Sequence, residues 1–256
     1  MEIVYDDNGS GPEVLLLHSG VCDRRMWRPQ SEVLSRSHRV VAPDLPGFGD
    51  SPLEPGEFSS TAELVRLLDN LDIRQVAVVG SSYGGRVALE LVEEAPDRIR
   101  ALVLLCPAYR GLDATATAET FDADEEGRLE AGDVDGAVEL NVRTWLGPEA
   151  DDATRDLVRT MQRRAFDVQL AADAWPEPPE PIRVDPDLSA IGVPVFVVTG
   201  GHDMDHFQNI ARHLAATIPD AHLVELPWAG HLPSLERPAE VTALLTGFLA
   251  EPATGR

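Results

Sequence analysis

The stretch RQVAVVGSSYGGRVALEL, residues 74–91, decides the fold of this chain. It reads as a short apolar strand, a glycine-bracketed turn at 80–84, and a run with helical spacing. The turn, GSSYG, fits the pattern G-x-S-x-G, which turns a strand into a helix and exposes the hydroxyl of its central serine, Ser82. Gly80 and Gly84 are needed because the backbone packs too closely there for side chains. The pattern predicts a nucleophilic serine.

The pattern alone is weak evidence, because a serine in an ordinary glycine-rich turn also satisfies it. Acyl transfer from a serine needs a base that takes its proton and an acid that orients the base. It also needs N–H groups that stabilise the negative oxygen of the tetrahedral intermediate. The rest of the chain has to supply these partners.

Length and composition indicate one large α/β domain, or a domain with a sizeable insertion. The chain has 256 residues, of which 43% are hydrophobic and 25% charged, as in globular proteins with a buried core. No apolar run approaches the roughly 18 residues that a membrane-spanning helix requires. The apolar run at 14–17 follows an acidic start and does not resemble a signal peptide. We therefore expect no membrane span and a cytoplasmic protein.

The charge is strongly negative. The formal net charge is −23, and all 21 basic residues are Arg. Such a charge opposes binding to nucleic acids and anionic lipids. The absence of Lys excludes Schiff-base and Ser-Lys chemistry. The two cysteines, Cys22 and Cys106, fit no metal spacing and are expected to be reduced. We expect a small-molecule substrate, no metal and no cofactor.

Predicted strands and helices alternate along both ends of the chain, which indicates right-handed crossovers and a largely parallel sheet. The strands are continuous apolar runs, as expected where helices cover both faces. The main predicted strands lie at 14–17, 38–44, 76–79, 102–106, 193–200 and 222–227, and further helices at about 60–70, 207–218 and 238–249. The fold class is therefore α/β.

Residues 109–190 break the alternation. They hold 20 Asp and Glu against 8 Arg, a net charge of −12. Amphipathic helices are predicted at 129–145 and 154–170, followed by a stiff proline connector at 176–181. We expect a helical cap inserted into a core formed by 1–108 and 191–256. Because ligands of open α/β sheets bind at the carboxyl ends of the strands, the cap would roof a pocket there. A surface insertion without that role is the alternative.

The best candidates for the base and the acid lie late in the chain. His231, in WAGHLPSLERP, follows the last predicted strand, and Asp203, in TGGHDMDH, follows the strand at 193–200. The order Ser82, Asp203, His231 matches serine, acid, histidine. Asp205 is the second choice for the acid. The cluster His202, Asp203, Asp205 and His206 could also be a set of metal ligands, although no further ligand cluster accompanies it.

The oxyanion hole is predicted from two backbone N–H groups. Tyr83 begins the helix after the turn, and Gly20 lies in HSGV, the loop after the strand at 14–17. His18 is expected to brace that loop. Candidate pocket-lining side chains are aromatic, with an ordinary role in the core as the alternative. They are Trp27, Tyr83, Trp145, Phe166 and Trp175.

Five segments together resemble the α/β-hydrolase superfamily with a cap domain: HSG at 18–20, DLPGFGDS at 44–51, GSSYGG at 80–85, GGHD at 200–203 and GH at 230–231. The resemblance covers 1–108 and 191–256, and is greatest to small cofactor-free hydrolases similar to enol-lactonases, esterases and cofactor-free haloperoxidases. It implies an eight-stranded type of sheet and a triad of Ser82, Asp203 and His231. Epoxide hydrolases and haloalkane dehalogenases of this type have aspartate where Ser82 stands, so both are disfavoured. Ser19 departs from the glycine usual in the family.

The leading hypothesis is a hydrolase of a carboxylic ester or lactone that acts through an acyl-enzyme on Ser82. Cleavage of a carbon–carbon bond next to a carbonyl, or peracid formation, would use the same triad. A ligand sensor that signals through movement of the cap is a different class, and an acidic cap is compatible with a basic protein partner. The sequence leaves the substrate and the oligomeric state open.

Overall fold

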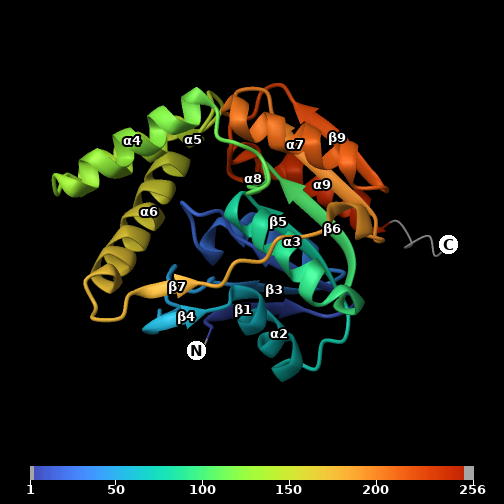
Figure 1. Ribbon diagram of the computed structural model, residues 1–256. Coiled ribbons are helices and arrows are strands. Elements are labelled where there is room, and N and C mark those ends of the chain that lie inside the picture. The colour runs from blue at the N-terminus through green and yellow to red at the C-terminus, as the bar shows by residue number, and fades with distance from the viewer. Residues whose placement is uncertain (1–2, 251–256) are drawn as a thin grey trace.

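A computed structural model describes residues 3–250, and its centre is a seven-stranded sheet in the order β1-β3-β2-β5-β6-β8-β9 (Figure 1). β1, at one edge, pairs antiparallel with β3, and the other pairings are parallel. The strands are β1 (Tyr5–Gly9), β2 (Glu13–Leu17), β3 (Arg39–Pro43), β5 (Val76–Ser81), β6 (Ile99–Leu105), β8 (Val195–Gly200) and β9 (Ala221–Leu226). The sheet in residues 3–250 therefore has seven strands, not the eight-stranded type that the family resemblance implies. Within these residues only Ile3 and Val4 precede β1.

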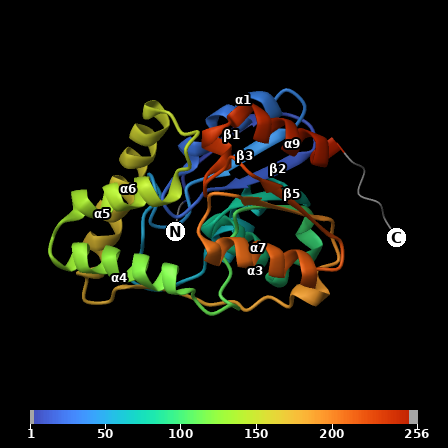
Figure 2. The same ribbon diagram turned by 90° about the horizontal axis from the view of Figure 1, so that it is seen from above.

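Helices cover both faces of the sheet, as the apolar strands predict. Val14 and Leu16 pack toward α1 (Arg28–Leu34) and α9 (Pro238–Ala250). Leu15 and Leu17 point to the opposite face, where α2 (Ser60–Asn70), α3 (Tyr83–Glu94) and α7 (Asp205–Thr217) lie (Figure 2). The remaining short helices are α8 (Pro233–Glu236) and the 3-10 turns Arg24–Trp27, Pro96–Arg98 and Leu188–Ala190.

Three helices from the middle of the chain form a group to one side of the sheet (Figures 1 and 2): α4 (Ala116–Glu130), α5 (Val134–Trp145) and α6 (Asp152–Asp173). The prediction of one helix over 129–145 is wrong. The chain breaks at Gly132, whose φ of +74° is left-handed, and Asp133 then caps α5 by accepting a hydrogen bond from the Gly136 N–H.

The end of the predicted proline connector is extended and paired, whereas its first residues, 176–177, lie in a bend. β7 (Pro179–Pro181) lies parallel to β4 (Gly56–Phe58) in a separate two-stranded sheet. No helix between residues 3 and 250 is both long and apolar enough to cross a membrane.

The parallel strands bring the candidate residues to one edge of the sheet. β2, β5 and β8 end just before His18, Ser82 and Asp203, respectively, and His231 follows β9. Because parallel strands share the same carboxyl edge, segments far apart in the sequence converge there.

Candidate active site

Ser82 sits at the tightest point of the strand-to-helix turn, between β5 and α3. Its φ of +51° is left-handed, a conformation that costs energy for a residue with a side chain. Hydrogen bonds hold it there: its N–H donates to the Leu105 carbonyl oxygen at 2.9 Å, and its carbonyl oxygen accepts from the Ala108 N–H at 3.0 Å. A Cβ atom on Gly80 would lie 2.4 Å from the Gly84 carbonyl oxygen. The turn therefore requires glycine where the sequence predicts it.

Asp203 and His231 form a buried hydrogen-bonded pair. The distance between Asp203 Oδ2 and His231 Nδ1 is 2.8 Å, and the side chains are 0% and 2% exposed. The Met204 N–H donates to the other carboxylate oxygen, Oδ1, at 2.7 Å. A carboxylate at Nδ1 favours the tautomer with its proton on that nitrogen. Nε2 is then left as a proton acceptor, as a base requires.

Residues from three other elements hold the His231 segment. The His231 N–H donates to the carbonyl oxygen of Trp145, the last residue of α5, at 2.9 Å. The rings of Trp145 and Phe207 lie 4.7 and 4.2 Å from the imidazole, centre to centre. The Gly230 N–H donates to Glu236 of α8 at 3.0 Å, and burial raises the pKa of that carboxyl group. The histidine is thus fixed by its ring and by its backbone.

The segments predicted to form the oxyanion hole are adjacent. The Tyr83 N–H belongs to the first turn of α3, where N–H groups have no partner within the helix. A Cβ atom on Gly20 would lie 3.4 Å from Tyr83 Cβ, and the Gly84 N–H donates to the His18 carbonyl oxygen at 3.0 Å. The loop after β2 is therefore attached to the start of α3.

His18 braces this loop, in agreement with its predicted role. Its Nδ1 donates to the Ser19 carbonyl oxygen at 2.8 Å, and its Nε2 accepts from the Leu45 N–H at 2.9 Å. Both ring nitrogens of the neutral form are therefore occupied. Burial lowers the pKa of this histidine, which keeps it neutral.

A cavity of about 230 Å³ contains both Ser82 and His231 in its wall. Two of the predicted aromatic residues, Trp145 and Phe166, line it, whereas Trp27 and Trp175 do not. Trp27 is fully buried in the core cluster beside the sheet, and Trp175 is half-buried beyond the end of α6. The Tyr83 ring faces elsewhere, against Phe48 at 5.5 Å.

The sequence reasoning missed the polar part of this wall, which comes from α4, α5 and α6. The additional lining residues from these helices and α7 are Phe121, Glu125, Asn141, Gln162, Gln169 and Phe207. A signal was available: Asn141 stands four residues before Trp145, and Gln162 four before Phe166. Side chains at this spacing share one face of a helix.

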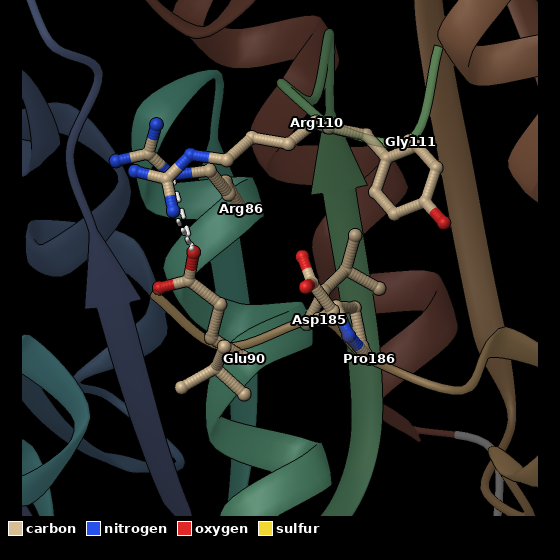
Figure 3. Close-up of a pocket in the computed structure, with 9 residues that line it drawn as sticks. Arg86, Glu90, Arg110, Gly111, Asp185 and Pro186 are labelled. Carbon is tan, nitrogen blue, oxygen red and sulfur yellow. Dashed lines mark hydrogen bonds and ion pairs between the residues drawn. The ribbon is translucent and has the colours of Figure 1, made fainter. Parts of the chain in front are cut away.

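A second pocket, of about 170 Å³, lies against α3 (Figure 3). Arg86 and Arg110 converge on the Glu90 carboxylate, with N···O distances of 3.3 and 3.5 Å. Burial raises the pKa of Glu90. Asp185, which also lines the pocket, adds a second carboxylate to the two guanidinium groups. The charges balance, and Ser82, Asp203 and His231 are not among the lining residues.

In the described residues, His202, Asp203, Asp205 and His206 do not form a group whose ligand atoms could bind one metal ion. In residues 3–250, the group whose ligand atoms lie within 4.8 Å of one another is Cys106, Asp203 and His231. Burial raises the pKa of the Cys106 thiol well above its usual range, so it is protonated and a poor ligand. Asp205, the second choice for the acid, instead accepts a hydrogen bond from Thr115 Oγ1 at 2.7 Å.

The fold and the order of these residues define a hydrolase of the α/β type. The alpha/beta hydrolase family matches residues 14–244, and the chain belongs to this family.

The chain is 28% identical to 2-hydroxymuconate semialdehyde hydrolase of Pseudomonas sp., over 96% of this chain and 89% of that protein. Among solved structures it is similar to a thermophilic esterase from Thermogutta terrifontis, at 27% identity and a TM-score of 0.78, over 96% of this chain and 92% of that one. It is also similar to the enol-lactonase from Burkholderia xenovorans LB400, at 25% identity and a TM-score of 0.80, over 97% and 96%. The relatives are hydrolases, and the chain is an enzyme of this class.

Proposed function

We propose that this protein hydrolyses a small carboxylic ester or lactone through a triad of Ser82, His231 and Asp203. One observation carries the proposal. His231 Nδ1 lies 2.8 Å from Asp203 Oδ2, while the same imidazole lines a cavity together with the strained serine. This arrangement provides a nucleophile, an oriented base and a buried anion.

The reaction follows from these positions. His231 Nε2 takes the proton of Ser82 Oγ as that oxygen attacks the substrate carbonyl carbon. The N–H groups of Gly20 and Tyr83 bind the oxyanion of the tetrahedral intermediate. His231 then gives its proton to the leaving alcohol oxygen, and an acyl-enzyme forms. Water activated by His231 cleaves the acyl-enzyme, and the Asp203 carboxylate stabilises the imidazolium in both steps.

Residues 109–190 would form the cap of this enzyme, over a core of 1–108 and 191–256. Its helices supply the polar wall of the cavity, and the Trp145 carbonyl oxygen accepts the His231 N–H. α6 also reaches the loop after β3, where Arg164 Nε donates to the Gly49 carbonyl oxygen at 3.0 Å. A cap in this position restricts the substrate to a small molecule.

An ester or lactone is supported by the similarity to the esterase and the enol-lactonase. The second candidate is carbon–carbon bond hydrolysis. It is supported by the relative that is a hydrolase of a muconate semialdehyde, a compound without an ester bond. That substrate carries a carboxylate. The cavity wall contains Glu125 and neither Arg nor Lys, a lining that favours a neutral acyl group.

The test is the release of nitrophenol from 4-nitrophenyl acetate, in the burst and in the steady state, with Ser82→Ala. We expect a loss in kcat of about 10⁴–10⁶-fold, as for removal of a nucleophile that acts together with its base. Ser81→Ala is the matched control, because the buried Ser81 Oγ has no hydrogen-bond partner in the described residues and its loss should leave the rate intact. An S82A variant with the wild-type rate would refute the assignment. Rapid acylation without turnover would favour the ligand sensor.

A further inference from the structure

Gln162 places an unsatisfied acceptor in the wall of the catalytic cavity. The side chain lies on α6 and is 4% exposed, and its Oε1 is buried without a hydrogen-bond partner within residues 3–250. A buried carbonyl oxygen without a donor is unfavourable for the empty protein. As it lies, Oε1 has almost no accessible surface, so rotation of the amide is needed to turn this acceptor toward the cavity. A ligand that brings a donor to the rotated amide would remove the cost.

A neighbouring network holds a second acceptor in the same wall. Asn141 Oδ1 accepts from Trp145 Nε1 at 2.6 Å. Asn141 Nδ2 donates to the Ala137 carbonyl oxygen at 3.0 Å and to Glu125 Oε1. The Asn141 amide is thereby occupied, and it orients the Glu125 carboxylate. A carboxylate has about four acceptor positions, so Glu125 can accept further hydrogen bonds.

The charge and size of the cavity limit what these acceptors can bind. Its lining includes the Glu125 carboxylate and neither Arg nor Lys. Burial raises the pKa of Glu125, and the hydrogen bond from Asn141 opposes that shift by stabilising the carboxylate. With Glu125 ionised, a second carboxylate from the substrate would be repelled there. The volume of about 230 Å³ is below the roughly 300–1,000 Å³ of typical ligand pockets, so the acyl group has to be short.

We propose that Gln162 and Glu125 form an acceptor subsite that binds a hydroxyl or N–H group on a short, uncharged acyl part of the substrate. The inference deepens the proposed ester or lactone hydrolysis and rests on it. The subsite selects for uncharged, substituted acyl groups such as hydroxyacyl derivatives. It selects against dicarboxylic half-esters.

The test compares three 4-nitrophenyl esters of similar length: butanoate, 3-hydroxybutanoate and hemisuccinate. The wild type is expected to have a kcat/KM about tenfold higher for the hydroxy ester than for butanoate, because one hydrogen bond satisfies a buried acceptor. The hemisuccinate should be the poorest of the three. No preference for the hydroxy ester, or a preference for the hemisuccinate, overturns the subsite.

Two variants separate the two acceptors. Gln162→Leu, of similar side-chain volume, should remove the preference, so that the ratio of kcat/KM for the hydroxy ester to kcat/KM for butanoate falls to about one. Glu125→Gln should raise kcat/KM for the hemisuccinate relative to butanoate. Gln75→Leu is the matched control, since Gln75 is exposed before β5 and its Nε2 donates to the Asp97 carbonyl oxygen. Equal losses on all three esters in Q162L would show a packing role only.

Failure of the proposed reaction is distinguishable from failure of the subsite. Hydrolysis of butanoate, and its loss in S82A, reports the reaction, whereas the ratio between esters reports the subsite. If no ester is cleaved, calorimetric binding of 3-hydroxybutanamide and butanamide to the unmodified protein still measures the ratio. Equal binding of the two amides overturns the subsite.

Discussion

Replacement of Asp203 by asparagine should disable the base without changing the shape of the site. The Met204 N–H donates to Oδ1, so the amide oxygen of the introduced asparagine has to take that position. The amide NH₂ group then faces His231 Nδ1, which lies 2.8 Å from the carboxylate in the wild type. Nδ1 is forced to accept, and the single proton of the neutral ring moves to Nε2. The nitrogen that faces the serine is then a donor and cannot take its proton.

The magnitude follows from the burial of the pair. With exposed fractions of 0% and 2%, neither side chain can exchange this contact for water. A wrong tautomer in a comparable triad lowers kcat by about 10⁴-fold. At about 1.36 kcal/mol per tenfold, this corresponds to about 5.4 kcal/mol of lost transition-state stabilisation. We expect this loss for Asp203→Asn in the acylation burst with 4-nitrophenyl acetate.

The control is Asp205→Asn, because Asp205 begins α7, accepts from Thr115 Oγ1 and is not among the residues that line the cavity. It should keep a rate within about threefold of the wild type. Thermal unfolding of both variants shows whether the fold is retained. If D203N were within tenfold of the wild type, or D205N were the slower variant, the acid would be wrongly assigned.

Three further predictions concern stability and the wall of the cavity. Gly84→Ala should lower the free energy of unfolding by about 2 kcal/mol or more, because its Cβ atom would lie 2.3 Å from a carbonyl oxygen of β2. Gly247→Ala, in the open face of α9, should raise the free energy of unfolding by about 0.5–1 kcal/mol. Urea titration measures both changes. Burial lowers the pKa of His18 in the folded protein, so the unfolded chain binds the proton more tightly, and stability should fall below about pH 6.5 by up to about 1.36 kcal/mol per pH unit. His18→Gln should reduce this slope, and a part should remain because burial also lowers the pKa of His38. An unchanged slope would contradict the cause. Asn141→Leu frees Trp145 Nε1 and should lower kcat as well as raise KM, whereas an effect on KM alone would show that the wall and the base are independent.

The convergence of the candidate residues at one edge of the sheet could be predicted because each motif is short and follows a strand. The glycines around Ser82 have a steric cause that leaves few alternatives, and parallel strands bring their carboxyl ends together wherever they lie in the chain. Asp203 could be preferred over Asp205 because it is nearer the end of β8. The sheet has seven strands and not the expected eight-stranded type, because the expected number of strands came from the family resemblance and not from the residue pattern.

The segment 109–190 was harder to predict because its helices pack on one another and on loops. Trp27 and Trp145 are both buried aromatics of the same core cluster, yet only Trp145 also lines the cavity. Only tertiary packing separates them. The break at Gly132 was missed because the apolar pattern continues across it, whereas the left-handed backbone interrupts the helix. The lining residues of 109–190 therefore could be found only from the three-dimensional structure, whereas the topology alone was enough to bring the proposed triad residues together.

Trp145 joins the wall of the cavity to His231, the proposed base. Its indole Nε1 donates to Asn141, which orients Glu125, and its carbonyl oxygen accepts the N–H of His231. Its ring also lies 4.7 Å from the imidazole. A substrate group bound by Glu125 would therefore contact a hydrogen-bonded network that extends through Asn141 and Trp145 to His231. Asp203 positions the proposed base from the core side and Trp145 positions it from the other. The proposed cap would therefore take part in proton transfer as well as cover the substrate.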